Sequence, residues 1–138
     1  MGGKMSRDKG ARGEREFINL IREVVGKVYC GKEFDAPFIR RNSFQSFRGG
    51  SDVHGLDWLA LEIKFQESLN LTGWWAQTVR QAGPGQLPVL AYRKSRVKWR
   101  VRMPGYLPAG KRRVKTIVDI SLEAFLAYLE LELKNRLI

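Results

Sequence analysis

Apolar residues recur every three to four positions in three segments of the chain, and this spacing predicts three amphipathic helices. The first is expected over residues 13 to 28, and its apolar stripe consists of Phe17, Leu20, Ile21, Val24, Val25 and Val28. The second is expected to start at a capping Asn70 or Thr72 and to end near Gln81. The third follows a capping Ser121, and its apolar side consists of Leu122, Phe125, Leu126, Leu129 and Leu133.

Four other segments are short and apolar or alternating, which is typical of strands. Residues 59 to 65 form the most apolar run and contain charged residues, and residues 87 to 92 form a second buried run. Residues 96 to 102 alternate strictly, which predicts a strand with one apolar face and one face with four bases. A fourth strand is expected over residues 114 to 120, after a Pro- and Gly-rich linker over residues 103 to 110.

The order helix, strands, helix, strands, helix predicts an α/β fold with a central mixed β-sheet flanked by helices, including an extra C-terminal helix. One folded domain is expected over residues 13 to 138. Residues 1 to 12 are polar, basic and glycine-containing, and they are expected to form a flexible basic arm. A short strand over residues 37 to 41 is expected to lead into an exposed loop over residues 42 to 51.

The charge of the chain is concentrated in one stretch. The 138 residues include 25 Lys and Arg against 14 Asp and Glu, a formal charge of +11, and no acidic residue lies between Glu67 and Asp119. The bases in that interval are Arg80, Arg93, Lys94, Arg96, Lys98, Arg100, Arg102, Lys111, Arg112, Arg113 and Lys115. Positive charge without interleaved acids predicts a phosphate backbone as partner.

Several classes of protein are not expected. The single Cys30 cannot form an internal disulfide, and the single His54 makes a histidine-rich zinc site hard to assemble. No apolar run reaches the length of a membrane-spanning helix. An acidic membrane surface is the weaker option for the basic stretch, since no basic amphipathic helix appears, so no membrane partner is expected. These features predict a cytoplasmic protein.

Two acidic residues occupy positions where burial is expected. Glu62 lies inside the most apolar strand, and the period of two places Lys64 on the same sheet face. Asp52 would lie beside Glu62 if residues 52 to 56 and 60 to 64 run antiparallel. Because a lone buried carboxylate is costly, the pair predicts an oxygen-rich site for a hard divalent cation.

The first helix offers a third carboxylate. On a helical wheel, Glu14 falls within about 40° of Ile21, Val25 and Val28, on the stripe that faces the core. Glu16 falls on the solvent side. Glu14 is therefore expected to approach Asp52 and Glu62 from above the sheet.

Other interpretations of these residues stay open. Glu62 and Lys64 could form a structural ion pair within the sheet, and Glu14 could simply stabilise the helix N-terminus. Asp57 competes with Asp52 for the role of ligand, but it leaves little room for a turn before Glu62 and is expected in a loop.

The order Glu14, Ser51-Asp52 and Glu62-Ile63-Lys64 resembles the PD-(D/E)XK nuclease superfamily, with serine where proline often stands. Within it, the chain is most similar to the archaeal-type Holliday junction resolvases and their phage-encoded relatives over roughly residues 8 to 102. The matching segments are Lys9-Gly10, Glu14-Arg15-Glu16, Arg40-Arg41, the acidic motif, Leu87-Pro88-Val89-Leu90 and a strand containing tryptophan. This resemblance implies a restriction-endonuclease-like core.

The resemblance also implies roles for these residues. Asp52, Glu62 and the Ile63 carbonyl would bind Mg²⁺ or Mn²⁺, Glu14 would support a second metal or its water, and Lys64 would position the attacking hydroxide. The expected DNA contacts are Lys9, Arg12, Arg40, Arg41, Arg48, Arg96, Lys98, Arg100, Arg102, Lys111, Arg112 and Arg113. Gln77 and Gln81 are candidate phosphate contacts. Phe44 and Phe47 would either stack on DNA or pack against their own subunit.

The expected function is metal-dependent resolution of four-way DNA junctions by a single nuclease domain. Paired cuts in opposed strands require two active sites, which predicts a homodimer. The alternatives are a less selective DNA endonuclease and a noncatalytic DNA-binding module with an architectural role.

Overall fold

The structure is a computed structural model, and it describes residues 2–29, 40–41 and 52–136. The helices within these ranges are α1 (Gly2–Val28), α3 (Leu71–Gln81) and α4 (Leu122–Arg136). The strands are β1 (Arg40–Arg41), β2 (Val53–His54), β3 (Leu59–Phe65), β4 (Leu87–Arg93), β5 (Arg100–Ala109) and β6 (Arg112–Ser121). None of the described helices has the length and apolar content needed to cross a membrane.

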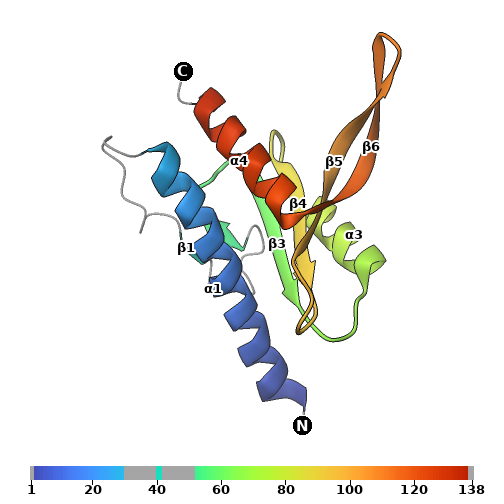
Figure 1. Ribbon diagram of the computed structural model, residues 1–138. Helices are drawn as coiled ribbons and strands as arrows, with labels where there is room; N and C mark the ends of the chain where they lie inside the picture. The colour runs from blue at the N-terminus through green and yellow to red at the C-terminus, as the bar shows by residue number, and fades with distance from the viewer. Residues whose placement is uncertain (1, 30–39, 42–51, 137–138) are drawn as a thin grey trace.

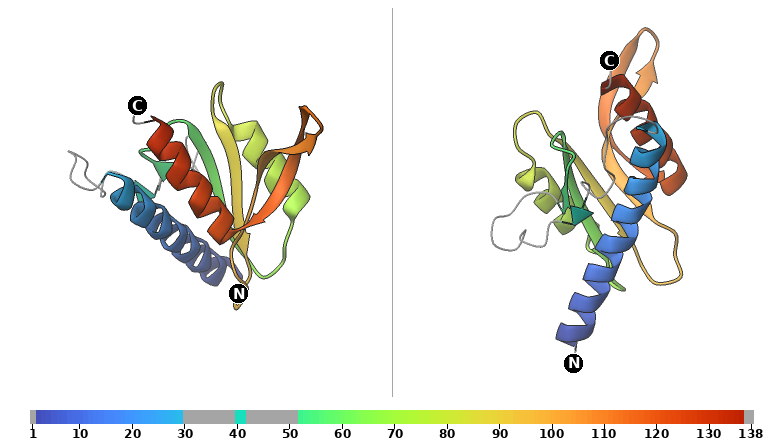
Figure 2. Two further views of the ribbon diagram at one scale, coloured as in Figure 1. Left: turned by 45° about the horizontal axis from the view of Figure 1, so that its top comes forward. Right: turned by 90° about the vertical axis from the view of Figure 1, so that its left-hand side faces the viewer.

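The main sheet is four-stranded and mixed, with the order β3-β4-β5-β6. β3 and β4 run parallel and are connected through α3, whereas β5 and β6 follow as antiparallel neighbours. Figures 1 and 2 show α1 and α4 together on one face of this sheet and α3 on the other. β1 and β2 form a separate two-stranded sheet. The predicted α/β fold with a mixed sheet between helices is therefore confirmed.

The larger core fills the space between the sheet and the α1–α4 pair. Phe17 and Ile21 of the predicted α1 stripe are fully buried there, together with Phe125 of α4. The Phe17 ring centroid lies 5.0 Å from that of Trp99 and 5.9 Å from that of Phe125. Each such buried side chain contributes about 1.5–3 kcal/mol, so this contact fixes α1 on the sheet.

A smaller core under α3 positions the opposite face. Trp74 packs there against Leu90 and Tyr92 of β4. The helix starts where predicted, because the Asn70 side chain accepts a hydrogen bond of 3.2 Å from the Gly73 N–H. The predicted Ser121 cap of α4 is also confirmed by a hydrogen bond of 3.1 Å from the Ala124 N–H.

Helix α1 begins at Gly2, so the prediction that the first helix starts at residue 13 is wrong. The polar early turns of α1 are held by contacts that no local pattern reveals. The Lys9 ammonium and the Arg12 guanidinium lie 5.2 and 5.1 Å from the centroid of the Phe65 ring. Lys9 also forms an ion pair with Glu67. Bases that stack on an aromatic ring thus extend the helix beyond its apolar stripe.

The predicted linker over residues 103 to 110 is also wrong, because most of it belongs to β5. Pairing between β4 and β5 ends at Leu90 and Arg102, and beyond this point β5 pairs only with β6. Pro104 has no N–H to donate. Because β5 has a paired neighbour on only one edge at this point, a proline is tolerated in the strand. At the other end, the strand starts at Arg100 and not at residue 96, since Arg96 has a positive φ of 65°.

Candidate active site

The predicted pair Glu62 and Lys64 lies in the middle of β3 on the face that α3 covers. Their neighbours Leu61 and Ile63 point into the larger core, and alternation turns Glu62 and Lys64 the opposite way. Glu62 is only 3% exposed. The Lys64 Nζ atom lies 3.4 Å from Glu62 Oε1, so the two form a half-buried ion pair on one face, as expected.

Helix α3 supplies a second partner for Glu62. The Gln77 Nε2 atom donates a hydrogen bond of 3.2 Å to Glu62 Oε1. Gln77 is three residues beyond the buried Trp74 and next to the buried Thr78, the two residues that α3 buries. The packing of α3 therefore fixes the position from which Gln77 reaches the carboxylate.

Asp52 lies against the outer edge of β3 and is 1% exposed. Its N–H donates a hydrogen bond of 2.7 Å to the Leu61 carbonyl, and its Oδ2 atom accepts one of 2.7 Å from the Ile63 N–H. Because the N–H and C=O of a strand residue point to the same edge, the Ile63 carbonyl faces the edge where Asp52 lies. The structure thus brings together Asp52, Glu62 and the Ile63 carbonyl.

The strand pairing that was expected to do this is different. Residues 53 and 54 form β2, which pairs with β1 in the register Arg40 to His54 and Arg41 to Val53, rather than with residues 60 to 64. The contact between Asp52 and β3 is made by its own backbone and side chain. Asp52, directly before β2, is therefore held at the edge of β3 by its own two hydrogen bonds.

The charges around Asp52 strongly affect its protonation. Burial raises the pKa of the Asp52 carboxyl well above its ordinary value, and the negative charges of Glu62 and Glu14 raise it further. The Ile63 N–H and the Lys64 ammonium oppose this increase in pKa. Glu14 on α1 therefore acts electrostatically on the same site, as the helical wheel predicted, although it remains partly exposed.

The donor set suits a hard cation bound in part by water. Within the described residues, no three acidic, histidine or cysteine side chains gather closely enough to form a complete metal-binding group. Mg²⁺ usually binds proteins through one or two carboxylates and keeps several waters. Two buried carboxylates that carry mutually unfavourable charges, with a carbonyl at the same edge, fit such an ion.

The competing carboxylate Asp57 lies elsewhere. It is exposed in the turn before β3, and its backbone carbonyl accepts a hydrogen bond of 2.9 Å from Gln86 Nε2. Asp52 and not Asp57 therefore accompanies Glu62, as expected.

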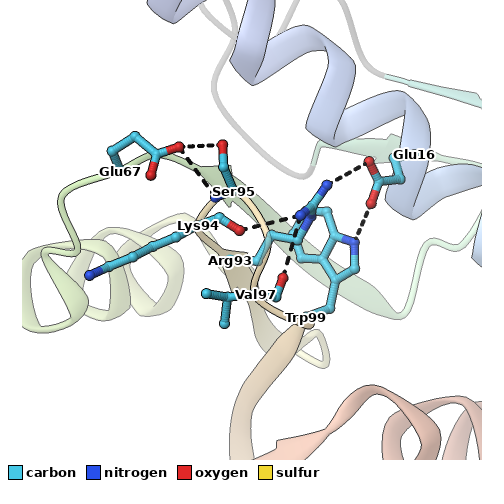
Figure 3. Close-up of polar contacts among 7 residues, drawn as sticks. All are labelled: Glu16, Glu67, Arg93, Lys94, Ser95, Val97 and Trp99. Carbon is cyan, nitrogen blue, oxygen red and sulfur yellow. Dashed lines mark hydrogen bonds and ion pairs between the residues drawn. The ribbon is translucent and has the colours of Figure 1, made fainter.

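Glu16 is not a simple solvent-facing residue, contrary to the helical-wheel prediction. Its two carboxylate oxygens accept hydrogen bonds of 2.8 Å from Trp99 Nε1 and 3.1 Å from Arg93 Nη2 (Figure 3). The Arg93 guanidinium in turn lies 4.1 Å from the centroid of the Phe65 ring. The turn between β4 and β5 covers this side of α1, which a wheel cannot show. Glu16 therefore ties α1 to the sheet.

The expected DNA contacts fall into different groups. Bases that are exposed on the described surface are Arg12, Arg96, Lys98, Arg100, Lys111, Arg112 and Arg113. Arg102 differs, since its Nε and Nη2 atoms lie 3.0 and 3.1 Å from the two carboxylate oxygens of Asp119. Tyr92 Oη donates a further hydrogen bond of 2.7 Å to Asp119. Arg102 therefore helps to join β4, β5 and β6.

The remaining candidates are placed only in part. Lys9 is half-buried beside Phe65, and Gln81 is half-buried at the end of α3. Arg40 and Arg41 form β1, as the predicted basic strand requires. Arg48, Phe44 and Phe47 lie outside the described residues.

Comparison of the chain with protein-family models, with curated protein sequences and with solved structures gave no match. Because a fold class alone does not determine a function, the activity has to be inferred from the residues of the site. Within the confirmed α/β fold, the restriction-endonuclease-like core stays a prediction.

Proposed function

We propose that the chain is a metal-dependent endodeoxyribonuclease that hydrolyses phosphodiester bonds in branched DNA, with four-way junctions as its preferred substrate. The active site consists of Asp52, Glu62 and Lys64, and Glu14 acts on it electrostatically. Gln77 positions the Glu62 carboxylate.

The observation that carries this proposal is the burial of two neighbouring carboxylates in a strongly basic protein. Asp52 and Glu62 are 1% and 3% exposed, and burial together with the negative charge of Glu62 raises the pKa of Asp52. A structural role alone explains this poorly, because buried like charges destabilise a fold unless something neutralises them. The Lys64 ammonium supplies one positive charge at Glu62, and a bound divalent cation would supply the rest.

Each group then has a definite task. Asp52, Glu62 and the Ile63 carbonyl would hold Mg²⁺ or Mn²⁺, and the bound ion would make a water more acidic and neutralise charge that develops on phosphate oxygens. The Lys64 ammonium, held by Glu62, orients the attacking water or stabilises the same negative charge. Gln77 keeps Glu62 in place by its hydrogen bond from α3.

The charge of the surface supports DNA as the substrate. The acid-free interval between Glu67 and Asp119 carries eleven bases, and most of those named as DNA contacts are exposed. Contacts of this kind hold a phosphate backbone without reading its sequence, which suits recognition of a branched shape. Two opposed cuts in a junction need two sites, so the active form is a homodimer.

Cleavage of end-labelled substrates tests the proposal. A four-way junction and a linear duplex of matched sequence are incubated with the 138-residue chain and Mg²⁺, and in parallel with EDTA. Paired, symmetric cuts in the junction alone, abolished by EDTA, are expected.

Two other outcomes would change the conclusion. Equal cleavage of junction and duplex would leave a nuclease without selectivity for branches. Binding without any cleavage in Mg²⁺ would overturn the enzymatic proposal in favour of an architectural DNA-binding module.

A further inference from the structure

The β5–β6 hairpin extends well beyond the rest of the sheet. Strand β4 accompanies β5 only as far as Arg102, whereas β5 and β6 remain paired as far as Ala109 and Arg112. Figures 1 and 2 show this part as a twisted two-stranded ribbon that projects away from the body of the molecule. Neither α3 nor α4 covers its end. The end of the ribbon, over residues 106 to 115, is exposed throughout and contributes to neither described core.

Exposed bases cluster at the end of this ribbon. They are Lys111, Arg112, Arg113 and Lys115, which lie in the turn and in the first half of β6. Within the described part of the chain, no acidic side chain lies within ion-pair distance of any of the four. Elsewhere on the surface, bases such as Lys27 and Lys134 are paired with Glu130. The charge at the ribbon end is therefore uncompensated.

An aromatic side chain accompanies the bases. Tyr106 is 57% exposed, and the Arg113 guanidinium lies 5.1 Å from the centroid of its ring. This contact holds Arg113 against the ribbon and limits its freedom before any ligand binds. On the other ribbon face, Leu107 and Val114 are cross-strand partners and are also exposed. Exposed apolar and basic groups occur together, which is unusual for a surface that only needs to be soluble.

We propose that the end of the β5–β6 hairpin is a DNA-binding finger that enters the major groove of a duplex. A two-stranded β-ribbon fits the major groove of B-form DNA, and its bases then reach phosphates on both walls. The major groove of A-form RNA is too narrow to admit it. A second copy of this chain fits poorly as the partner, because two uncompensated basic ribbon ends would repel each other. This inference rests on the proposed function for its choice of DNA as the ligand.

The finger and the candidate active site share one face of the sheet. The cross-strand row Glu62, Leu90, Arg102 and Asp119 lies on the α3 face. Alternation along β5 and β6 places Tyr106, Arg113 and Lys115 on that same face. On this face, helix α3 lies between the finger and the active-site residues. Its Gln77 contacts Glu62, and its Trp75 lies near Pro104 and Ile117. A DNA arm held by the finger therefore lies on the face that carries the active-site residues.

Binding measurements in EDTA separate this inference from cleavage. The triple variant Lys111→Gln, Arg112→Gln and Arg113→Gln is compared with the control triple Lys27→Gln, Lys134→Gln and Arg136→Gln, which removes the same charge from α1 and α4. Fluorescence anisotropy is recorded with a DNA duplex and an RNA duplex of equal length and sequence over a range of salt concentrations. All substituted positions are exposed, and thermal unfolding verifies that both variants are folded.

The finger triple is expected to weaken duplex DNA binding about 30-fold or more and to reduce the slope of log affinity against log salt by about 2 to 3. The control triple should change both quantities far less. For the RNA duplex, the finger triple and the control triple should have similar affinities. A second variant, Tyr106→Ala, is expected to weaken DNA binding several-fold with the salt slope unchanged, since it removes no charge.

Two results would overturn the inference. Equal losses in the finger and control triples would show that only overall charge matters, and equal losses on DNA and RNA would exclude the major groove as the docking place. Neither result concerns the active site, because cleavage plays no part in the measurement. Conversely, the finger triple could lose DNA binding as expected while the native protein cleaves no DNA. That combination would support the finger and overturn only the proposed nuclease activity.

Discussion

Gln77 on α3 donates a hydrogen bond of 3.2 Å to Glu62 on β3, and this bond joins the helix to the charged position inside the sheet. The bond fixes one carboxylate oxygen beside Lys64, whose ammonium contacts the same Oε1 atom at 3.4 Å. Gln77 acts through Glu62 and is therefore a positioning residue.

Replacement of Gln77 by alanine is expected to reduce Mg²⁺-dependent cleavage by about 10- to 100-fold, the usual effect of removing a group that orients a metal ligand. DNA affinity in EDTA should stay within about twofold, because no charge is removed. Cleavage rates and anisotropy measure the two effects. Thr72→Ala, an exposed change on the same helix, is the control. Equal loss of DNA affinity and cleavage would show that Gln77 contacts the DNA instead.

Asp52 gives a prediction about pH and stability. Its pKa in the folded protein is raised above the ordinary value of 3.8, chiefly by burial. Below that ordinary value the carboxyl is protonated in both states, so its favourable contribution to folding is fully present. As the pH rises through the folded pKa, the folded protein must bury a charge and this contribution is lost.

Asp52→Asn is therefore expected to raise the unfolding temperature by several degrees at pH 7 in EDTA, and by much less at pH 4. The amide oxygen still accepts the hydrogen bond from the Ile63 N–H, so the comparison isolates the charge. Thermal unfolding followed by circular dichroism measures the effect, with the exposed Asp57→Asn as control. If the unfolding temperatures of the variant and the native protein differed by the same amount at pH 4 and pH 7, the raised pKa of Asp52 would be contradicted.

Glu14 and Glu16 lie two positions apart on α1 but are expected to behave differently. Glu16→Ala removes the acceptor for Trp99 and Arg93, and it should lower the free energy of unfolding by about 1.5–3 kcal/mol. Its cleavage rate per folded molecule should not change. Glu14→Gln should reduce cleavage, because it removes a charge that acts on the Asp52 site. Chemical denaturation and cleavage assays on both variants, with Glu23→Gln as control, test this contrast, and a reversed pattern would contradict it.

Gly13 and Gly10 form a matched pair on α1. A Cβ atom at Gly13 would lie 2.5 Å from the Phe65 Cβ atom, whereas nothing lies within 4 Å of one at Gly10. Gly13→Ala should therefore destabilise the fold by about 1–3 kcal/mol through overpacking. Gly10→Ala should be neutral or stabilise it by up to about 1 kcal/mol. Denaturant unfolding distinguishes the two, and equal effects would show that α1 does not approach β3 as closely as described.

Features that depend on a few neighbouring residues were predictable from the sequence. The apolar stripe around Phe17, the caps Asn70 and Ser121, and the shared face of Glu62 and Lys64 follow from local periodicity and local hydrogen bonds. The prediction that Asp52 lies near Glu62 was correct. It was based on pairing of residues 52 to 56 with residues 60 to 64, whereas β2 pairs with β1.

Features that depend on distant segments were not predictable in the same way. Pro104 suggested a linker, and only the end of β4 at that level explains why a strand continues there. Glu16 faced solvent on the wheel because the turn that carries Arg93 and Trp99 comes from more than seventy residues away. Gln77 was a candidate for contact with phosphate, and its bond to Glu62 became visible only once α3 was placed on the sheet.

Single-turnover cleavage of a four-way junction by Glu62→Gln tests the central claim most directly. With saturating Mg²⁺, the variant is expected to lose roughly 100-fold or more of the native rate. Its affinity for the junction in EDTA should be unchanged or tighter, because a negative charge near phosphate is removed. Glu23→Gln, which changes an exposed glutamate on α1, should cleave at the native rate. Cleavage by Glu62→Gln at the native rate would show that the buried carboxylates Asp52 and Glu62 are not the active site.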